Sequence, residues 1–440
     1  MRVWERFSLK RWAALGLAFA AGALASRAIP SAAASGQNGT SADSDYRELS
    51  RFSRVLAHIE NSHLAPPGIH ELADGAIRGM VAALDPHSAF LSADEIRAME
   101  AQRRNGLTAD PGLALTMTPH EVPGGGGRIS RLTVVAPLDG SPAALAGILP
   151  GDKIVHIDGK PTLQLDPGMA EALLAGEEGS RVTVGVLRQG FSAVRNFTLL
   201  RAAPKARQAE ASLLEGGVGL IRIKRFDKGT AKDVGADLKA LAAKVPGGLK
   251  GLVLDLRNNP GGRLDEAARV ADFFLPGGRT IYTLKGRGGT PLEAPESHSQ
   301  NTEPPYPVAI LVNDGTASAA ELVAGALQDE KRAVLVGGRT FGKGSVQLAF
   351  GLDDGSALKL TVARYQTPSG REIHGRGLEP DWDIGRLEVS RLDFPLGIGH
   401  RAPLSGAVSP QRELGPGASG DLALAVALGW MTRHRETPVH

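Results

Sequence analysis

Apolar runs that alternate with helical patterns between residues 218 and 338 restrict the fold more than any other feature of this sequence. Strands are predicted at 218–223, 249–257, 308–314 and 333–338, and helices at 230–243, at 265–274 and directly after Ser318. The middles of the runs at 249–257 and 308–314 are almost wholly apolar, which indicates strands buried on both faces of a sheet. Together with a further strand at 357–365, these runs predict an α/β core.

The residues before this core form two regions with different patterns. Apolar residues recur at helical spacing over 46–63, and further helices are predicted at 69–84 and 92–102, the last with Ser92 and Glu95 as a capping box. From 107 to 203 the pattern changes to short strands and turns, with a short helix at 141–148 and another at 166–174. We therefore expect an N-terminal helical region at 45–106 and a compact, strand-rich module at 107–203.

The N-terminus has the composition of an export signal. Basic residues at 2, 6, 10 and 11 precede an apolar run at 12–25, and small-residue cleavage candidates lie at 23–25 and 32–34. The run is shorter than the about 20 apolar residues that span a membrane. We expect a signal peptide at 1–25, with an uncleaved anchor as the alternative, then a flexible linker at 26–44, and a location in the periplasm or cell envelope.

Charge and cysteine content exclude several kinds of site. The chain has 50 Lys and Arg against 47 Asp and Glu, a net charge of +3, and its first 25 residues alone carry four basic groups and one acid. The mature protein is then nearly neutral, which gives no reason to expect nucleic acid as a partner. Because there is no cysteine, disulfides, thiolate metal sites and a lipid-anchoring cysteine are excluded.

The stretch "NDGTASAAE" (313–321) places Ser318 between an apolar strand and a helix. A strand, a tight turn, a serine and a helix together expose a nucleophile at the positive end of the helix, where amides can hold an oxyanion. The helix carries an apolar stripe, so it packs against a core and holds the serine in place. Taken alone, the stretch favours a serine that only starts a helix.

A catalytic serine needs a base, and no base stands next to Ser318 in the sequence. His87 and His374 are not paired with it by spacing, whereas "GGRTFGKGSVQ" (337–347) places Lys343 in a glycine-flanked turn after a buried strand. Gln347 could bond the Lys343 amine, but in a straight strand the two would be roughly 13 Å apart, so the pairing requires a bend. The alternative for Lys343 is an ordinary solvated turn lysine.

Several segments, in order, resemble the bacterial carboxyl-terminal processing proteases, also called tail-specific proteases. They are "LVLDLRNNPGG", "ILVNDGTASAAELVAGALQDEKRAVLVGGRTFGKGSVQ" and "LKLTVARYQTPSGREIHGRGLEPD". Residues 75–95 resemble the helical segment before the PDZ domain of that family, 107–203 the PDZ domain and 421–428 the terminal helix. The resemblance implies an α/β multidomain protein, with a PDZ domain, a crotonase- and ClpP-like protease core at 204–386 and a tail at 387–440.

The resemblance also implies roles for individual residues. The Ser/Lys dyad of the family falls on Ser318 and Lys343, and its supporting glutamine falls on Gln347. The oxyanion amides would be those of Ala319 and Gly262, and no cofactor or metal is implied. In the PDZ domain, the loop that holds a peptide carboxylate would be residues 112–115, namely Gly112, Leu113, Ala114 and Leu115.

The sequence departs from the family pattern at three of these places. Thr316 and Ala320 stand where the family often has serine on either side of the nucleophile, and Ala114 replaces a glycine of the PDZ loop. The first two could alter the fine shape of the site, and the third could shift the affinity for a carboxylate. Residues 387–420 resemble nothing in the family.

The expected function is that of an exported serine endopeptidase that recognises protein C-termini through its PDZ domain and cleaves near them. A non-catalytic PDZ scaffold in the cell envelope is the main alternative, and a crotonase-like acyl-CoA enzyme is a third. Expected partners are proteins or peptides with exposed C-termini, and the resemblance allows a homodimer or higher oligomer and an activator protein.

Overall fold

The computed structural model describes residues 39–384 and 421–434, apart from residues 105, 122–127, 164, 204–206, 299 and 301. The predicted signal peptide and residues 387–420 lie outside the described residues. Contacts divide the chain into two compact units, and the boundary along the sequence falls between Ala73 and Asp74. Within the described residues, every helix is too short or too polar to cross a bilayer.

The first unit contains α2 (Gly39–Ser62) and the start of α3 (Ile69–Ala82). Helix α2 begins seven residues before the predicted start at 46, so the prediction of a linker is wrong for residues 39–44. Residues 40–44 contain no glycine or proline, and nothing in their sequence stops the helix from extending back to Gly39.

The second unit begins within α3 and continues through β1 (Ala89–Leu91) and α4 (Ala93–Arg104). The predicted capping box is confirmed at the start of α4. The backbone N–H of Ser92 donates to Glu95 Oε2 at 2.8 Å, and the Glu95 N–H donates to Ser92 Oγ at 3.3 Å. Strand β1 pairs with a strand more than 250 residues later, so this helical region is joined to the protease-like part of the chain.

The strand-rich module is an antiparallel sheet with two short helices. Its strands are β2 (Leu113–Glu121), β3 (Arg128–Pro137), β4 (Lys153–Ile157), β5 (Lys160–Pro161), β6 (Arg181–Leu187) and β7 (Arg195–Leu200), in the order β2-β3-β4-β6-β7 with β5 on β4. Helix α5 (Pro142–Leu145) is capped by Ser141, and α6 (Pro167–Leu174) by Asp166. Inward-facing aliphatic residues of β2, β3, β4 and β6 form one core with α5 and α6.

The α/β core is a six-stranded sheet in the order β17-β14-β13-β10-β9-β8. Its strands are β8 (Ala209–Leu214), β9 (Val218–Ile223), β10 (Gly251–Asp255), β13 (Val308–Val312), β14 (Val334–Gly337) and β17 (Trp382–Asp383). All neighbours pair in parallel except β8, which is antiparallel to β9. Every residue of β10 and β13 is buried, as the apolar runs predicted.

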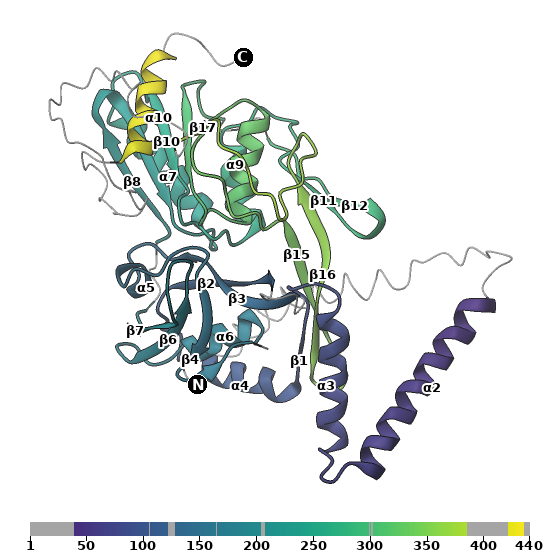
Figure 1. The fold of residues 1–440 in the computed structure, drawn as a ribbon. Coiled ribbons are helices and arrows are strands. Elements are labelled where there is room, and N and C mark those ends of the chain that lie inside the picture. Colours follow the sequence, from purple (N-terminus) through teal and green to yellow (C-terminus); the bar gives the residue numbers. More distant parts are fainter. Residues whose placement is uncertain are drawn as a thin grey trace, which may run out of the picture. The chain divides into compact units, whose positions relative to one another are not determined.

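Helices cover both faces of this sheet. Alternate residues of β10, such as Leu252 and Leu254, pack with α7 (Thr230–Ala243), α8 (Leu264–Asp272) and α9 (Ala319–Asp329). The intervening Val253 packs against α10 (Leu422–Arg433), drawn in yellow beside β10 in Figure 1. Successive strand residues point to opposite faces, so a wholly apolar strand requires this double cover.

Besides the six-stranded sheet, the α/β core has a second sheet, which was mostly not predicted from the sequence and carries part of the candidate site. It has the order β1-β16-β11-β12, and β15 pairs with β16. Its other members are β11 (Thr283–Lys285), β12 (Pro291–Glu293), β15 (Ser345–Gly351) and β16 (Ala357–Gln366), with 3-10 turns at η1 (Glu215–Gly217) and η2 (Arg287–Gly289) elsewhere. Strand β15 begins two residues after Lys343, and Figure 1 shows it as a long hairpin with β16.

Candidate active site

Ser318 lies between β13 and α9 in a strained backbone conformation. Its φ is 56° and its ψ is −121°, values that residues other than glycine rarely adopt. Backbone strain of this kind costs about 1–3 kcal/mol and persists only where the surrounding structure imposes it. Here α9 imposes it, because residues Ala319 to Leu327 are all buried. The structure therefore holds Ser318 more rigidly than a simple helix cap requires.

Glu321 connects Ser318 to Lys343, and the sequence analysis did not identify it. Its buried carboxylate accepts hydrogen bonds from the backbone N–H groups of Ser318 (2.9 Å), Lys343 (2.9 Å) and Gly342 (2.8 Å) and from the hydroxyl of Thr340. Since Ser318 and Lys343 share Oε2, their nitrogens cannot be farther apart than twice 2.9 Å. The capping-box spacing from Ser318 to Glu321 was a signal that could have revealed it.

The buried position of Glu321 changes its acidity. Burial raises the pKa of this carboxyl to about 7, against the lowering effect of the four hydrogen bonds that it accepts. The group is therefore ionised only above neutral pH. In that form both oxygens serve the backbone that carries Ser318 and Lys343.

Lys343 lines a pocket of about 200 Å³ together with Gln347, His87, Glu171 and Lys359. Burial and the nearby charge of Lys359 lower the pKa of the Lys343 amine, while Glu171 opposes this effect. Within the described residues its Nζ has no hydrogen bond or ion pair. A partly desolvated amine with a lowered pKa can be neutral and accept a proton, which an ordinary exposed turn lysine cannot do near neutral pH.

Gln347 lines the same pocket as Lys343, although both belong to one stretch of extended chain. Lys343 precedes β15, and the register of β15 on β16 shifts between Val346 and Gln347, so the chain between the two residues is not a regular strand. The Nε2 group of Gln347 donates to Ser345 Oγ at 3.0 Å and to Thr361 Oγ1 at 3.2 Å.

The two histidines that the sequence left without a partner lie near this pocket. The rings of His87 and His374 meet edge to face, with centroids 5.6 Å apart. Burial and the charge of Lys343 lower the pKa of His87 to about 4, so its ring is neutral at physiological pH. Gly344 fits closely against His374, because a Cβ on Gly344 would lie 2.8 Å from the backbone nitrogen of His374.

The glycines of the "NPGG" turn approach Ser318 closely. Gly261 has a φ of 97°, and a Cβ there would lie 2.7 Å from Ser318 Cβ and 2.8 Å from the Ala319 nitrogen. Gly262 has a φ of 134°, and a Cβ there would lie 2.3 Å from Phe226 O. Both positions therefore exclude side chains, Gly261 because of Ser318 and Gly262 because of the backbone carbonyl of Phe226.

Two backbone N–H groups beside Ser318 have no partner in the described part of the chain. The N–H of Gly261 donates to Asn259 Oδ1 at 2.9 Å, whereas those of Gly262 and Ala319 donate to no described residue. Ala319 is the first residue of α9, where helical N–H groups have no partner within the helix. The two predicted oxyanion amides thus have no hydrogen-bond acceptor among the described residues.

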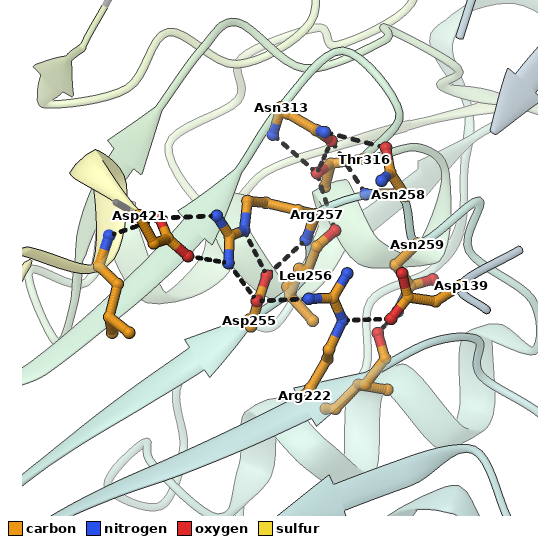
Figure 2. A network of polar contacts seen from close by, with 12 residues as sticks. Asp139, Arg222, Asp255, Leu256, Arg257, Asn258, Asn259, Asn313, Thr316 and Asp421 are labelled. Carbon is orange, nitrogen blue, oxygen red and sulfur yellow. Dashed lines mark hydrogen bonds and ion pairs between the residues drawn. The ribbon is translucent and has the colours of Figure 1, made fainter. Parts of the chain in front are cut away.

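The turns on either side of Ser318 are bound to each other by side chains (Figure 2). Asn313 Oδ1 accepts from the Asn258 N–H at 2.9 Å, and Asn313 Nδ2 donates to Asn258 Oδ1 at 2.9 Å. Thr316 donates its hydroxyl to Leu256 O at 2.8 Å and accepts from the Asn313 N–H at 3.0 Å. Thr316, which stands where the family often has serine, thus supplies a hydroxyl that joins the turns.

A charged network fixes the end of β10 (Figure 2). Buried Asp255 lies 2.6 Å from Arg257 Nη2 and 3.2 Å from Arg222 Nη1. Arg257 also contacts Asp421, the N-cap of α10, at 2.8 Å, and Arg222 Nε lies 2.6 Å from Asp139 Oδ2. Burial alone would raise the pKa of Asp255, but the two arginines outweigh it and leave that pKa below its usual value. The network anchors the strand from which the "NPGG" turn starts.

The predicted carboxylate loop lies at the start of β2. Gly112 has a φ of 80°, and a Cβ there would lie 2.2 Å from Ser141 Cβ. Leu113 and Leu115 are buried, and the register of β2 shifts between Ala114 and Leu115. Leu115 also lines the pocket that contains Lys343. The structure thus brings one end of the predicted peptide site and the candidate base to the same pocket.

A strained helix-start serine and a buried lysine on an α/β core with a small β-rich module define a serine peptidase with an accessory domain. Comparison with known families agrees: the model for peptidase family S41 matches residues 217–384, and a PDZ domain model matches 133–188. The chain belongs to peptidase family S41 and is a serine-type, C-terminal processing peptidase.

Relatives along most of the chain support this assignment. The carboxy-terminal-processing protease of Bartonella bacilliformis is 36% identical over 337 residues, covering 76% of this chain and 75% of that protein. The carboxyl-terminal-processing protease of Synechocystis is 37% identical, with 75% of each chain covered. Among solved structures, the photosystem II D1 C-terminal processing protease matches with a TM-score of 0.63 and 30% identity, covering 77% of this chain and 88% of that one. The predicted fold class is confirmed.

Proposed function

We propose that this peptidase is an exported endopeptidase that uses a Ser318/Lys343 dyad. The neutral Lys343 amine takes the proton from Ser318 Oγ as that oxygen attacks the scissile carbonyl, and the resulting ammonium then protonates the leaving amine. Water afterwards releases the acyl-enzyme. The observation that carries the proposal is the shared Glu321 Oε2, which accepts a hydrogen bond of 2.9 Å from the backbone N–H of each of the two residues.

The oxyanion of the tetrahedral intermediate would bind the N–H groups of Gly262 and Ala319. Both amides are without partners among the described residues, and Gly261, which precedes Gly262, lies close to Ser318 and to the Ala319 nitrogen. Fixed backbone donors of this kind are typically worth about 10²–10³ in rate each. The charged network around Asp255 supports the turn that carries them.

Substrate selection would take place in the PDZ domain. A peptide C-terminus would add as a strand beside β2, with its carboxylate at the amides of residues 112–115. Leu115 and Glu171 of this domain line the pocket that contains Lys343, so a bound C-terminus would lie near the dyad. This arrangement supports cleavage close to the recognised end of the substrate.

Export to the periplasm or cell envelope is proposed from the basic and apolar residues of the first 25 positions. Fractionation of cells and N-terminal sequencing of the mature protein test this part. Self-association is proposed from α2, which exposes Tyr46, Leu49, Phe52 and Val55. Sedimentation of the mature protein tests it, and a monomer at all concentrations would contradict it.

The decisive experiment incubates the mature protein with matched peptides that end in a free carboxylate or in an amide. We expect cleavage of the free-carboxylate peptide, no cleavage by Ser318→Ala or Lys343→Ala, and normal folding of both variants by circular dichroism. Ser356→Ala, which removes a buried serine outside the pocket, is the control and should retain activity. Wild-type cleavage by Lys343→Ala would refute the dyad, and equal cleavage of both peptides would refute recognition of the C-terminus. A non-catalytic scaffold would bind the peptides without cleaving them.

A further inference from the structure

The turn after α3 brings a carboxylate into the second sheet, next to the candidate site. Asp85 Oδ1 accepts from the N–H groups of His87 (2.7 Å) and Ser88 (3.0 Å), and its Oδ2 accepts from Ser88 Oγ at 2.7 Å. Its further donor comes from β16, where the Thr361 hydroxyl donates to Oδ1 at 3.0 Å. The Thr361 N–H also donates to Ser88 Oγ at 3.1 Å, so the turn and the strand are joined at two points.

Asp85 is an acceptor in each of these contacts. Burial by itself would raise the pKa of Asp85, but the hydrogen bonds that it accepts outweigh burial and leave the pKa below its usual value. The carboxylate is therefore ionised at neutral pH and has no proton to donate. It follows that Thr361 must be the donor in the Thr361–Asp85 hydrogen bond.

This direction determines how Thr361 meets Gln347. A hydroxyl has one proton, and Thr361 uses it on Asp85, so only its lone pairs remain for the Gln347 side chain. Thr361 stands directly opposite Gln347 in the β15–β16 register, and Gln347 Nε2 lies 3.2 Å from Thr361 Oγ1. The NH₂ end of the Gln347 amide must therefore face Thr361, and its carbonyl oxygen must point elsewhere.

The carbonyl oxygen is the end of Gln347 that a lysine amine needs. If Lys343 is the base, its lone pair must face the Ser318 hydroxyl, so the Gln347 side chain can orient the amine only by accepting one of its N–H bonds. The amide oxygen can do this and the amide NH₂ group cannot. Gln347 and Lys343 line one pocket, and the Lys343 Nζ has no partner in the described residues. We propose that Asp85 and Thr361 are positioning residues of this peptidase, which orient the Gln347 amide so that its oxygen, and not its NH₂ group, faces Lys343. The proposal rests on the proposed role of Lys343 as the base.

Asp85 lies outside both matched domains, since the S41 model begins at 217 and the PDZ model at 133. The helical region before the PDZ domain therefore contributes to the active site through a relay of side chains.

The test compares Thr361→Val, which removes the hydroxyl at nearly constant shape, with Thr361→Ser, which retains it. Without the relay the Gln347 amide can present NH₂ to Lys343, which removes an acceptor from the ammonium and lowers its pKa. We therefore expect Thr361→Val to lower kcat by about 10- to 100-fold with little change in KM, and to move the acid limb of the pH profile to lower pH. Thr361→Ser should remain within about threefold of wild type.

The acid limb also depends on the charged groups around Lys343, which are Lys359, Glu171, Arg225 and Asp166, and the titratable ring of His87 lies beside them. None of them is changed by the Thr361 variants, so a shifted limb reports the Gln347 orientation. A purely structural defect would reduce the amount of folded enzyme and leave the limb in place.

A second comparison uses the Gln347→Ala background, in which Thr361→Val should have no further effect beyond about twofold. The proposal would be overturned if Thr361→Val lowered kcat as much in the Gln347→Ala background as in the wild type. It would also be overturned if Thr361→Val had a wild-type rate and pH profile. Asp85→Asn is a supporting variant only, because Asp85 also holds the backbone of its own turn. Ser318→Ala is measured in parallel: if it retains activity, the dyad itself is wrong, whereas an inactive Ser318→Ala with a wild-type Thr361→Val refutes only the relay.

Discussion

Replacement of Gly261 by alanine separates the fit around Ser318 from general stability. A Cβ at this position would lie 2.7 Å from Ser318 Cβ and 2.8 Å from both Ala317 O and the Ala319 nitrogen. Carbon atoms in contact are ordinarily about 3.5–4.0 Å apart, so the turn or Ser318 must move by about 1 Å. The obstacles are backbone atoms and a Cβ, which no change of rotamer can remove.

The size of the effect follows from this displacement. A misplacement of about 1 Å in a catalytic group can reduce the rate about 10²-fold, which corresponds to about 2.7 kcal/mol in the activation free energy. The positive φ of 97° adds a backbone cost of about 1–2 kcal/mol for an alanine, which lowers stability. Activity and stability should therefore both fall, for different reasons.

Gly229 offers a matched control for the backbone cost. Its φ is 95°, almost the same as that of Gly261, but a Cβ there would meet nothing within 4 Å. We expect both alanine variants to lose stability in thermal unfolding, Gly261→Ala the more because its Cβ also meets close contacts, while only Gly261→Ala loses about 10²-fold in kcat on a peptide substrate. A wild-type kcat for Gly261→Ala, or an equal loss for Gly229→Ala, would refute the close packing of this turn against the nucleophile.

The remaining predictions concern charge around the dyad. Lys359→Met should raise the pKa of Lys343 and move the acid limb of kcat/KM to higher pH, whereas Glu171→Gln should move it to lower pH; shifts in the same direction would contradict the electrostatic account. Glu321→Gln should reduce kcat, because the NH₂ group of the new amide would face backbone N–H donors that now bond to a carboxylate oxygen. A wild-type kcat would show that Glu321 does not support the site. The folded state holds the Glu321 proton more tightly than the unfolded state, with a pKa of about 7 against 4.5. The free energy of unfolding should therefore fall by about 3 kcal/mol as pH rises through this range. Urea titrations measure this fall, and Glu321→Gln should not show it.

Much of the fold was predictable because local patterns determine it. The apolar runs became β9, β10, β13 and β14. The capping box of Ser92 and Glu95 was also readable, because a cap depends on residues within one turn of the helix. The second sheet was mostly missed, since β15 mixes polar and apolar residues and is stabilised by pairing with a distant strand.

The sequence by itself determined that Ser318 begins a helix after a buried strand, and its resemblance to a family pointed to Lys343 and Gln347. Only the tertiary structure decided how these residues are held. The contacts of Glu321 with the Lys343 backbone, and of Asp85 with Thr361, join residues separated by 22 and 276 positions along the chain. Spacing in a sequence carries no information about such contacts, because they depend on which strands pair and on where a register shift turns a side chain.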